Sequence, residues 1–229
     1  GLLNNLNVDV LFLPSEEEMY VNVKDVDIPP SGLFEKLEGQ SRPHFFYGVT
    51  KIVSKLFNVV TPTHTFFGEK DAQQLIIIQE MISKMNYTID LISCSTIRDE
   101  NGLALSSRNQ YLSKEERAEA SCFSKALLQI KESINKGELN SSVLKNQFEK
   151  NLSTSKKITL DYISIANKKT LSEIDVVVEN VLISGNNQIQ GQSIVYAHYD
   201  NTLFNNITIT DNEVESVFRS APTIKNTII

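Results

Sequence analysis

Residues 65–74 read TFFGEKDAQQ and contain the strongest signal for the fold. The first three residues, Thr65 to Phe67, have the β-branched and aromatic content of a short strand, and Gly68 begins a turn. From Leu75 to Met85, apolar residues recur at helical spacing. A strand that leads through a glycine turn into a helix is the building unit of an α/β sheet.

The flanking segments extend this pattern in both directions. Apolar positions between Val49 and Phe57 follow helical spacing and stop before Pro62, while Thr88–Ile92 alternates as a strand. Val8–Leu13 is an apolar run that we expect to form a buried strand. The order predicts parallel strands with right-handed crossovers, and ligands in such sheets bind beyond the carboxyl ends of the strands.

The pattern of apolar residues in the sequence stops near Ile97. A polar loop leads to a capping box at Ser113–Glu116, which opens a helix that we expect to end near Gly137. The remainder predicts one further helix and three strands, at 142–152, 158–165, 176–183 and 193–199. We therefore predict two domains, an α/β domain at 1–97 and a small α+β domain at 98–229.

Composition narrows the class of protein. The 229 residues have a formal net charge of −6, which argues against a nucleic-acid partner, because such proteins present a basic face. Cys94 and Cys122 match no disulfide framework or zinc motif, so we expect no metal site in the protein. Without an apolar run of about 18 residues or a signal-peptide pattern, we expect a cytoplasmic protein and no membrane partner.

Three segments contain residues suited to chemistry. The first is Gly68–Gln74, where a helix N-terminus and the charge of Lys70 could bind a phosphate. Taken alone, the same residues also suit a capped surface turn.

The second segment is the loop 102–111, GLALSSRNQY. Its adjacent hydroxyls and the guanidinium of Arg108 suit the oxygens of a triphosphate. Serine and asparagine are also what ordinary loops contain.

The third segment is 37–46, LEGQSRPHFF, in which Glu38 and Arg42 could reach a carboxylate-bearing substrate and the aromatic residues could cover a site. The alternative is a loop with core anchors. His64 and His198 lie at or in predicted strands, and we interpret both as structural.

In this order, the segments LEGQSRPHFFYGV, VSKLFN, FGEKDAQQ and NGLALSSRNQYLS resemble the pantothenate synthetase family. The resemblance covers Leu6–Tyr111 well and extends more loosely to Ile207. It implies a Rossmann-like nucleotidyltransferase domain followed by a smaller domain, and a homodimer at full length. It further implies that Mg²⁺-bound ATP activates pantoate as pantoyl adenylate, from which β-alanine displaces AMP.

The same resemblance assigns residues to ligands. Lys70 and the loop Ser106, Ser107 and Arg108 would contact the phosphates. Gly68 and Asp71 would lie at the ribose, with Glu69 in the nucleotide site beside them. Ile97 and Leu105 would touch adenine or the adjoining backbone, and Gln74 would bind pantoate. We expect Lys70, Ser106, Ser107 and Arg108 to be catalytic, and Glu38 and Arg42 to bind substrate with Gln74.

The chain also departs from the family pattern. No His-x-Gly-His motif occurs in the sequence, and we expect the N-terminal catalytic segment that contains it to be missing. Phe45 stands where bacterial members usually have histidine, with His44 one residue earlier. Asp200–Leu203 replaces a glycine-threonine-arginine stretch, and Thr210–Ile229 matches nothing in the family.

Two competing hypotheses follow. Because the motif histidines are absent, the chain as given would be inactive alone and would act as a nucleotide-binding or interaction module. A different adenylating or cytidylyl-transferring enzyme on the same fold is the other alternative, since a fold does not fix a substrate. The combination of Gln74 with the other segments argues against the latter.

Overall fold

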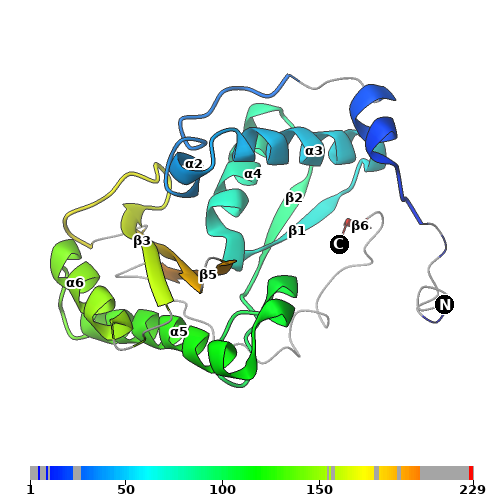
Figure 1. Ribbon diagram of the computed structural model, residues 1–229. Helices are drawn as coiled ribbons and strands as arrows, with labels where there is room; N and C mark the ends of the chain where they lie inside the picture. Colours follow the sequence, from blue (N-terminus) through cyan, green and yellow to red (C-terminus); the bar gives the residue numbers. More distant parts are fainter. Residues whose placement is uncertain are drawn as a thin grey trace.

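The computed structural model describes residues 11–22, 27–153, 155, 158–177, 181–189, 192–201 and 227–228, together with residues 5 and 9. Figure 1 shows the arrangement of its elements. In chain order they are η1 (Glu18–Asn22), α2 (Glu38–Ser41), α3 (Phe45–Val60), β1 (His64–Gly68), η2 (Glu69–Asp71), α4 (Ala72–Lys84), β2 (Asp90–Cys94), η3 (Ser107–Tyr111), α5 (Lys114–Asn135), α6 (Ser141–Leu152), β3 (Ile158–Asn167), β4 (Val181–Ile189), β5 (Gln192–Asn201) and β6 (Thr227–Ile228).

The first sheet is parallel, with the strand order β2-β1-β6. Phe66 of β1 is in register with Ile92 of β2. A core cluster that includes Phe57 of α3 and Ile78 of α4 packs against Phe67 of β1. The predicted sequence of helix, strand, helix and strand between residues 49 and 92 is therefore confirmed, and the mixed α/β fold with it.

The second sheet is antiparallel, with the order β3-β4-β5. Phe123 of α5, Phe148 of α6 and Ile165 of β3 belong to one buried cluster. The two phenylalanine rings meet edge to face, with centroids 5.1 Å apart. Figure 1 shows α5 and α6 running beside this sheet. The predicted α+β content of the second half is confirmed.

The boundaries of α5 follow from its capping residues. Ser113 Oγ accepts a hydrogen bond from Glu116 N at 3.2 Å, and Glu116 Oε2 accepts one from Ser113 N at 2.8 Å. At the other end, Gly137 adopts a φ of 96°, a value that favours glycine and ends the helix. Both ends of this helix lie where the sequence predicts them.

Two predicted strands differ from the structure. Residues 11–13 form no strand, and residues 8 and 10 lie outside the described part. The expectation of a buried strand is wrong for these three residues, because their side chains are 49% to 80% exposed. The strand expected at 176–183 begins instead at Val181, while Val176 makes only an isolated bridge with Asn140.

A third core cluster links the two halves of the chain. Leu33, Phe46 and Ala72 pack in it with Leu171 and Leu182. The domain boundary near Ile97 stays a prediction. In the part of the chain that the structure describes, no helix has the length and apolar character needed to cross a membrane.

Candidate functional site

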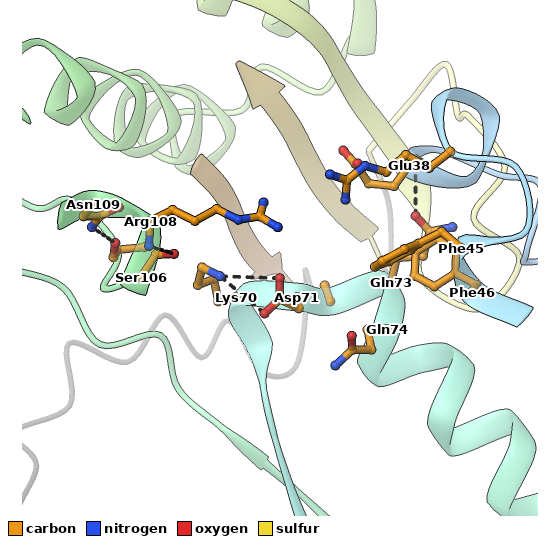
Figure 2. Close-up of a pocket in the computed structure, with 13 residues that line it drawn as sticks. Glu38, Phe45, Phe46, Lys70, Asp71, Gln73, Gln74, Ser106, Arg108 and Asn109 are labelled. Atoms are coloured by element: carbon orange, nitrogen blue, oxygen red, sulfur yellow. Dashed lines mark hydrogen bonds and ion pairs between the residues drawn. The ribbon is translucent and has the colours of Figure 1, made fainter. Parts of the chain in front are cut away.

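A cavity of about 250 Å³ brings together residues from three separate segments of the chain. Figure 2 shows the side chains around it. Its lining residues are Glu38, Arg42, Phe45, Phe46, Lys70, Asp71, Ala72, Gln73, Gln74, Ala104, Ser106, Arg108 and Asn109.

The first wall follows the carboxyl end of β1. The strand ends at Gly68, η2 spans Glu69–Asp71, and α4 starts at Ala72. Lys70 Nζ lies 3.4 Å from Asp71 Oδ2, and this ion pair borders the cavity. Gln74 lies in the first turn of α4. The chain direction thus places a cation and an amide beyond the end of a parallel strand, where α/β sheets bind ligands.

The second wall is the loop that follows β2. Asn109 is only 4% exposed and fixes this loop, because its Nδ2 donates to Ala104 O at 2.9 Å. Arg117 Nη2 donates to Asn109 O at 3.0 Å and ties the loop to α5. Ser106 Oγ accepts from Arg108 N at 3.3 Å. Figure 2 shows the Arg108 side chain extending from this anchored loop toward Lys70 and Asp71.

The third wall comes from the segment around α2. Glu38 is 6% exposed and lines the cavity. The guanidinium carbon of Arg42 lies 5.2 Å from the centre of the Phe45 ring, a cation–π distance. Phe45 and Phe46 meet edge to face with centroids 5.1 Å apart. This side of the cavity therefore combines two charges with an aromatic surface.

The charges around the cavity suit a ligand with more than one anionic group. Arg42, Lys70 and Arg108 are cationic, whereas Glu38 and Asp71 are acidic. Guanidinium and ammonium groups bind phosphates and carboxylates through charge-assisted hydrogen bonds. Among the described residues, no group of three or more His, Cys, Asp or Glu side chains is placed to hold a metal ion.

The structure places seven of the residues predicted from the sequence around this cavity. They are Glu38, Arg42, Lys70, Asp71, Gln74, Ser106 and Arg108. Gly68, Glu69, Ile97, Leu105 and Ser107 are not among the lining residues.

Local contacts explain some of these differences. Glu69 Oε1 accepts a hydrogen bond from Ser93 Oγ at 3.2 Å, so its carboxylate is turned toward β2. Ile97 and Leu105 are exposed by 56% and 51%, and Leu105 N donates to Ile97 O at 2.9 Å. Ser107 is exposed at the start of η3.

Sequence reasoning missed several lining residues, of which Gln73 and Asn109 matter most. Both lie inside the quoted motifs, next to Gln74 and Arg108 respectively. Both are buried amides, and both hydrogen-bond to backbone atoms. Their position inside the motifs was the only signal in the sequence. The sequence does not show that a polar residue in a loop or at the start of a helix is buried.

Cys94, the last residue of β2, is a free thiol close to Glu69. Burial raises the pKa of the Cys94 thiol above its ordinary value, and the negative charge of Glu69 raises it further. A raised pKa keeps the thiol protonated at neutral pH, whereas a reactive cysteine needs a lowered one. Cys94 is therefore not an activated nucleophile.

The fold and cavity define an α/β protein with a charged ligand site beyond the carboxyl ends of two parallel strands. The family model described as pantoate-beta-alanine ligase matches residues 1–212. The pantothenate synthetase of Acetivibrio thermocellus is 42% identical over 177 residues, which cover 77% of this chain and 63% of that protein.

Two solved structures are also similar. Pantothenate synthetase from Thermus thermophilus matches with a TM-score of 0.78 and 32% identity, covering 86% of this chain and 71% of that one. Pantoate-beta-alanine ligase from Francisella tularensis, solved with beta-gamma ATP and beta-alanine, matches with a TM-score of 0.60 and 28% identity. That match covers 86% of this chain and 66% of the other.

This chain belongs to the pantoate–β-alanine ligase family. It spans 62% to 66% of the length of the first three curated relatives that it matches.

Proposed function

We propose that the protein acts as a pantoate–β-alanine ligase that uses ATP, and that the cavity described above is its site for pantoate and the nucleotide. The observation that carries this proposal is that Arg108 lines one cavity with Lys70 and Gln74, although Arg108 comes from a separate segment of the chain. The Francisella ligase, solved with an ATP compound and β-alanine, supports the choice of substrates.

Each proposed role follows from the chemistry of the side chain. Lys70 and Arg108 neutralise phosphate oxygens from two sides of the cavity, and Ser106 donates a hydrogen bond to the same group. Gln74 offers an amide to pantoate at the start of α4. Arg42 would bind a substrate carboxylate, and Glu38 would accept a hydrogen bond from a substrate hydroxyl.

The proposed nucleotide site extends beyond the residues that line the cavity. Gly68 and Glu69 precede Lys70 beneath the nucleotide, and Asp71 reaches the ribose. Ile97 and Leu105 provide an exposed apolar surface for adenine, which would become buried when the nucleotide binds.

Ser107 extends the loop that carries Ser106 and Arg108. Its hydroxyl is a further donor for a phosphate oxygen in this proposal.

The reaction has two balanced steps. A carboxylate oxygen of pantoate attacks the α-phosphorus of ATP, which forms pantoyl adenylate, a mixed anhydride of pantoate and AMP, and releases pyrophosphate. The amine of β-alanine then attacks the acyl carbon, loses a proton, and displaces AMP. Because no bond to the protein is formed, catalysis depends on positioning and on stabilising negative charge in the transition state.

Magnesium would arrive with the triphosphate. The ion is usually held by one or two carboxylates together with substrate phosphates, and Asp71 is the carboxylate next to Lys70 in the cavity. When bound, it neutralises charge on the phosphate oxygens. We further propose that the protein is a homodimer at full length, as the family resemblance implies, and that it is cytoplasmic, as its sequence composition predicts.

The test is product analysis with the full-length gene product. Incubation with ATP, magnesium, pantoate and β-alanine should yield pantothenate, AMP and pyrophosphate in equal amounts, measured by mass spectrometry. Release of pyrophosphate that does not depend on pantoate would contradict the proposed substrate. Transfer of a cytidylyl group in place of an adenylyl group would favour the related transferases instead.

A second candidate concerns the 229-residue chain on its own. No His-x-Gly-His motif occurs in its sequence, and its three histidines are His44, His64 and His198. We infer that this polypeptide binds nucleotide weakly and turns over little, as a nucleotide-binding module would. Measuring AMP and pantothenate from the purified chain decides the point, because turnover equal to that of the Acetivibrio thermocellus pantothenate synthetase would exclude this candidate.

A further inference from the structure

Gln73 is a buried polar side chain at the first turn of α4, with only 7% of its surface exposed. Its Nε2 donates to Leu33 O at 3.0 Å and to Lys36 O at 2.8 Å. Its Oε1 accepts from Glu38 N at 3.1 Å. One side chain therefore binds three backbone groups of a segment that lies more than thirty residues earlier in the chain.

These contacts leave Gln73 little capacity to bind a ligand. A glutamine amide has two N–H donors, and both are used here on carbonyl groups. The side chain of Gln74, its neighbour, also lines the cavity but makes no hydrogen bond to another residue in the described part of the chain. The two adjacent glutamines therefore differ in role: Gln73 binds the protein backbone, and Gln74 is available to bind a ligand in the cavity.

The segment that Gln73 holds has an unusual backbone. Leu37 adopts a φ of 43°, which costs energy for a residue other than glycine. Gly39 lies so close to Phe34 that an added Cβ would meet the Phe34 carbonyl oxygen at 1.8 Å. A strained conformation persists only where its surroundings fix it, and Gln73 supplies hydrogen bonds on both sides of Leu37 that do so.

The strained segment carries two of the charges in the cavity. The backbone N–H of Glu38 donates directly to Gln73, and Arg42 follows one turn later, at the end of α2. Figure 2 shows Glu38 above Gln73, with a dashed line joining them. A shift of this backbone would move both charges relative to Lys70 and Gln74.

We propose that Gln73 is a positioning residue, which aligns Glu38 and Arg42 with the ligand groups at the start of α4 for binding of pantoate. This inference rests on the proposed function, because it names the residue that sets the geometry of the same site. Gln73 acts through the segment Leu33–Arg42 and does not touch the substrate.

The experiment uses the full-length gene product with Gln73→Met, which keeps the approximate shape of the side chain and removes all three hydrogen bonds. Gln73→Ala is a second variant in case the methionine disturbs packing. Gln79→Ala is the matched control, since Gln79 is an exposed glutamine on the same helix. Hydrogen–deuterium exchange of peptides covering residues 33–42 and steady-state kinetics with pantoate are measured for each protein.

We expect exchange at Glu38 and its neighbours to become roughly tenfold faster in Gln73→Met, since each lost hydrogen bond opens the segment to solvent. Exchange in α5 should remain unchanged, which excludes global unfolding. The KM for pantoate should rise about tenfold, with a much smaller change in kcat, because misplaced charges weaken ground-state and transition-state binding alike. Gln79→Ala should match the parent in all three measurements.

Unchanged exchange in residues 33–42 would overturn the proposal. Faster exchange with an unchanged KM would also overturn it, because Gln73 would then be a structural residue only. If the parent protein shows no pantoate-dependent reaction, the proposed function fails. The exchange data alone would then show whether Gln73 fixes this segment.

Discussion

At the scale of single residues, the site depends on side chains whose backbone is held in place by hydrogen bonds from buried amides. Gln73 and Asn109 each bind backbone groups, and each stands next to a residue that lines the cavity. Arg108 in particular extends from an anchored segment. Pre-positioned charges stabilise a transition state more than mobile ones, because they need no reorganisation when the reaction occurs.

Lys70→Ala should slow adenylation by the full-length gene product by about 10²-fold, as the loss of one positioned electrostatic group commonly does. Pantoate-dependent exchange of labelled pyrophosphate into ATP measures this step. Lys84→Ala, at the far end of α4, is the control and should leave the rate unchanged. Equal rates in Lys70→Ala and the parent would remove Lys70 from the mechanism.

Cys94 provides a prediction about pH. Because burial and then Glu69 raise the pKa of its thiol, alkylation by iodoacetamide at pH ~8 should be slower than that of a free cysteine. The rate should still climb above about pH 8.5, where a free thiol is already half ionised. Site-resolved mass spectrometry separates Cys94 from Cys122. Alkylation of Cys94 as fast as that of a free cysteine would contradict the raised pKa.

Glu69→Gln tests the cause of this shift. Removal of the negative charge should lower the pKa of Cys94, and alkylation at pH ~8 should become faster, while the substituted amide can still accept from Ser93. Glu100→Gln serves as a control on an exposed loop. A rate in Glu69→Gln that equals the parent's would mean that burial alone raises the pKa.

At the scale of elements, α5 anchors the second wall of the cavity. Its N-terminus is fixed by the reciprocal bonds of Ser113 and Glu116. Arg117, one residue further on, donates to Asn109 O. The cap therefore lies close to the contact that fixes the loop of Arg108.

Ser113→Ala should lower the free energy of unfolding by about 1 kcal/mol, the usual effect of losing an N-cap hydroxyl. Denaturation by urea measures it. Ser142→Ala, at an exposed position near the start of α6, should change stability by less than about 0.5 kcal/mol. Similar losses in both variants would show that the capping box does not stabilise this helix.

The elements that could be predicted from the sequence are those with a local cause. The turn at Gly68 and the capping box at Ser113 lie where their patterns predict them. The apolar content of residues 11–13 predicts a strand, but strand formation needs a neighbouring strand, which a local pattern cannot reveal. Of the site, the charged residues of the cavity and Gln74 were predictable from the motifs, whereas the buried amides Gln73 and Asn109 were not.

The supporting contacts of the site were not predictable in the same way. The bonds from Gln73 join residues 35 to 40 positions apart, and Phe46 packs in one cluster with Leu171 and Leu182. Such contacts depend on the tertiary fold, and no local pattern encodes them.

At the scale of the whole molecule, the shared cluster of Phe46, Ala72, Leu171 and Leu182 joins the two halves. Phe46 and Ala72 also line the cavity. The cluster that packs the two halves together therefore shares two residues with the cavity lining. Damage to this cluster should affect the stability of both halves together.

Leu182→Ala should lower the free energy of unfolding by about 2–5 kcal/mol, because Leu182 is 1% exposed and its loss leaves a cavity. Probes in each half should still unfold at the same denaturant concentration. Leu128→Ala, which is 43% exposed, is the control and should cost far less. Two separate transitions in the parent would show that the halves are independent.

Binding of ATP, with magnesium, to the 229-residue chain tests whether the cavity is a nucleotide site. Isothermal titration should give weak but saturable binding, and Arg108→Ala should weaken it by roughly tenfold through loss of a charge-assisted contact. Lys136→Ala removes one exposed positive charge outside the cavity lining and should leave the affinity unchanged. If Arg108→Ala binds ATP as tightly as the parent does, the cavity is not the nucleotide site.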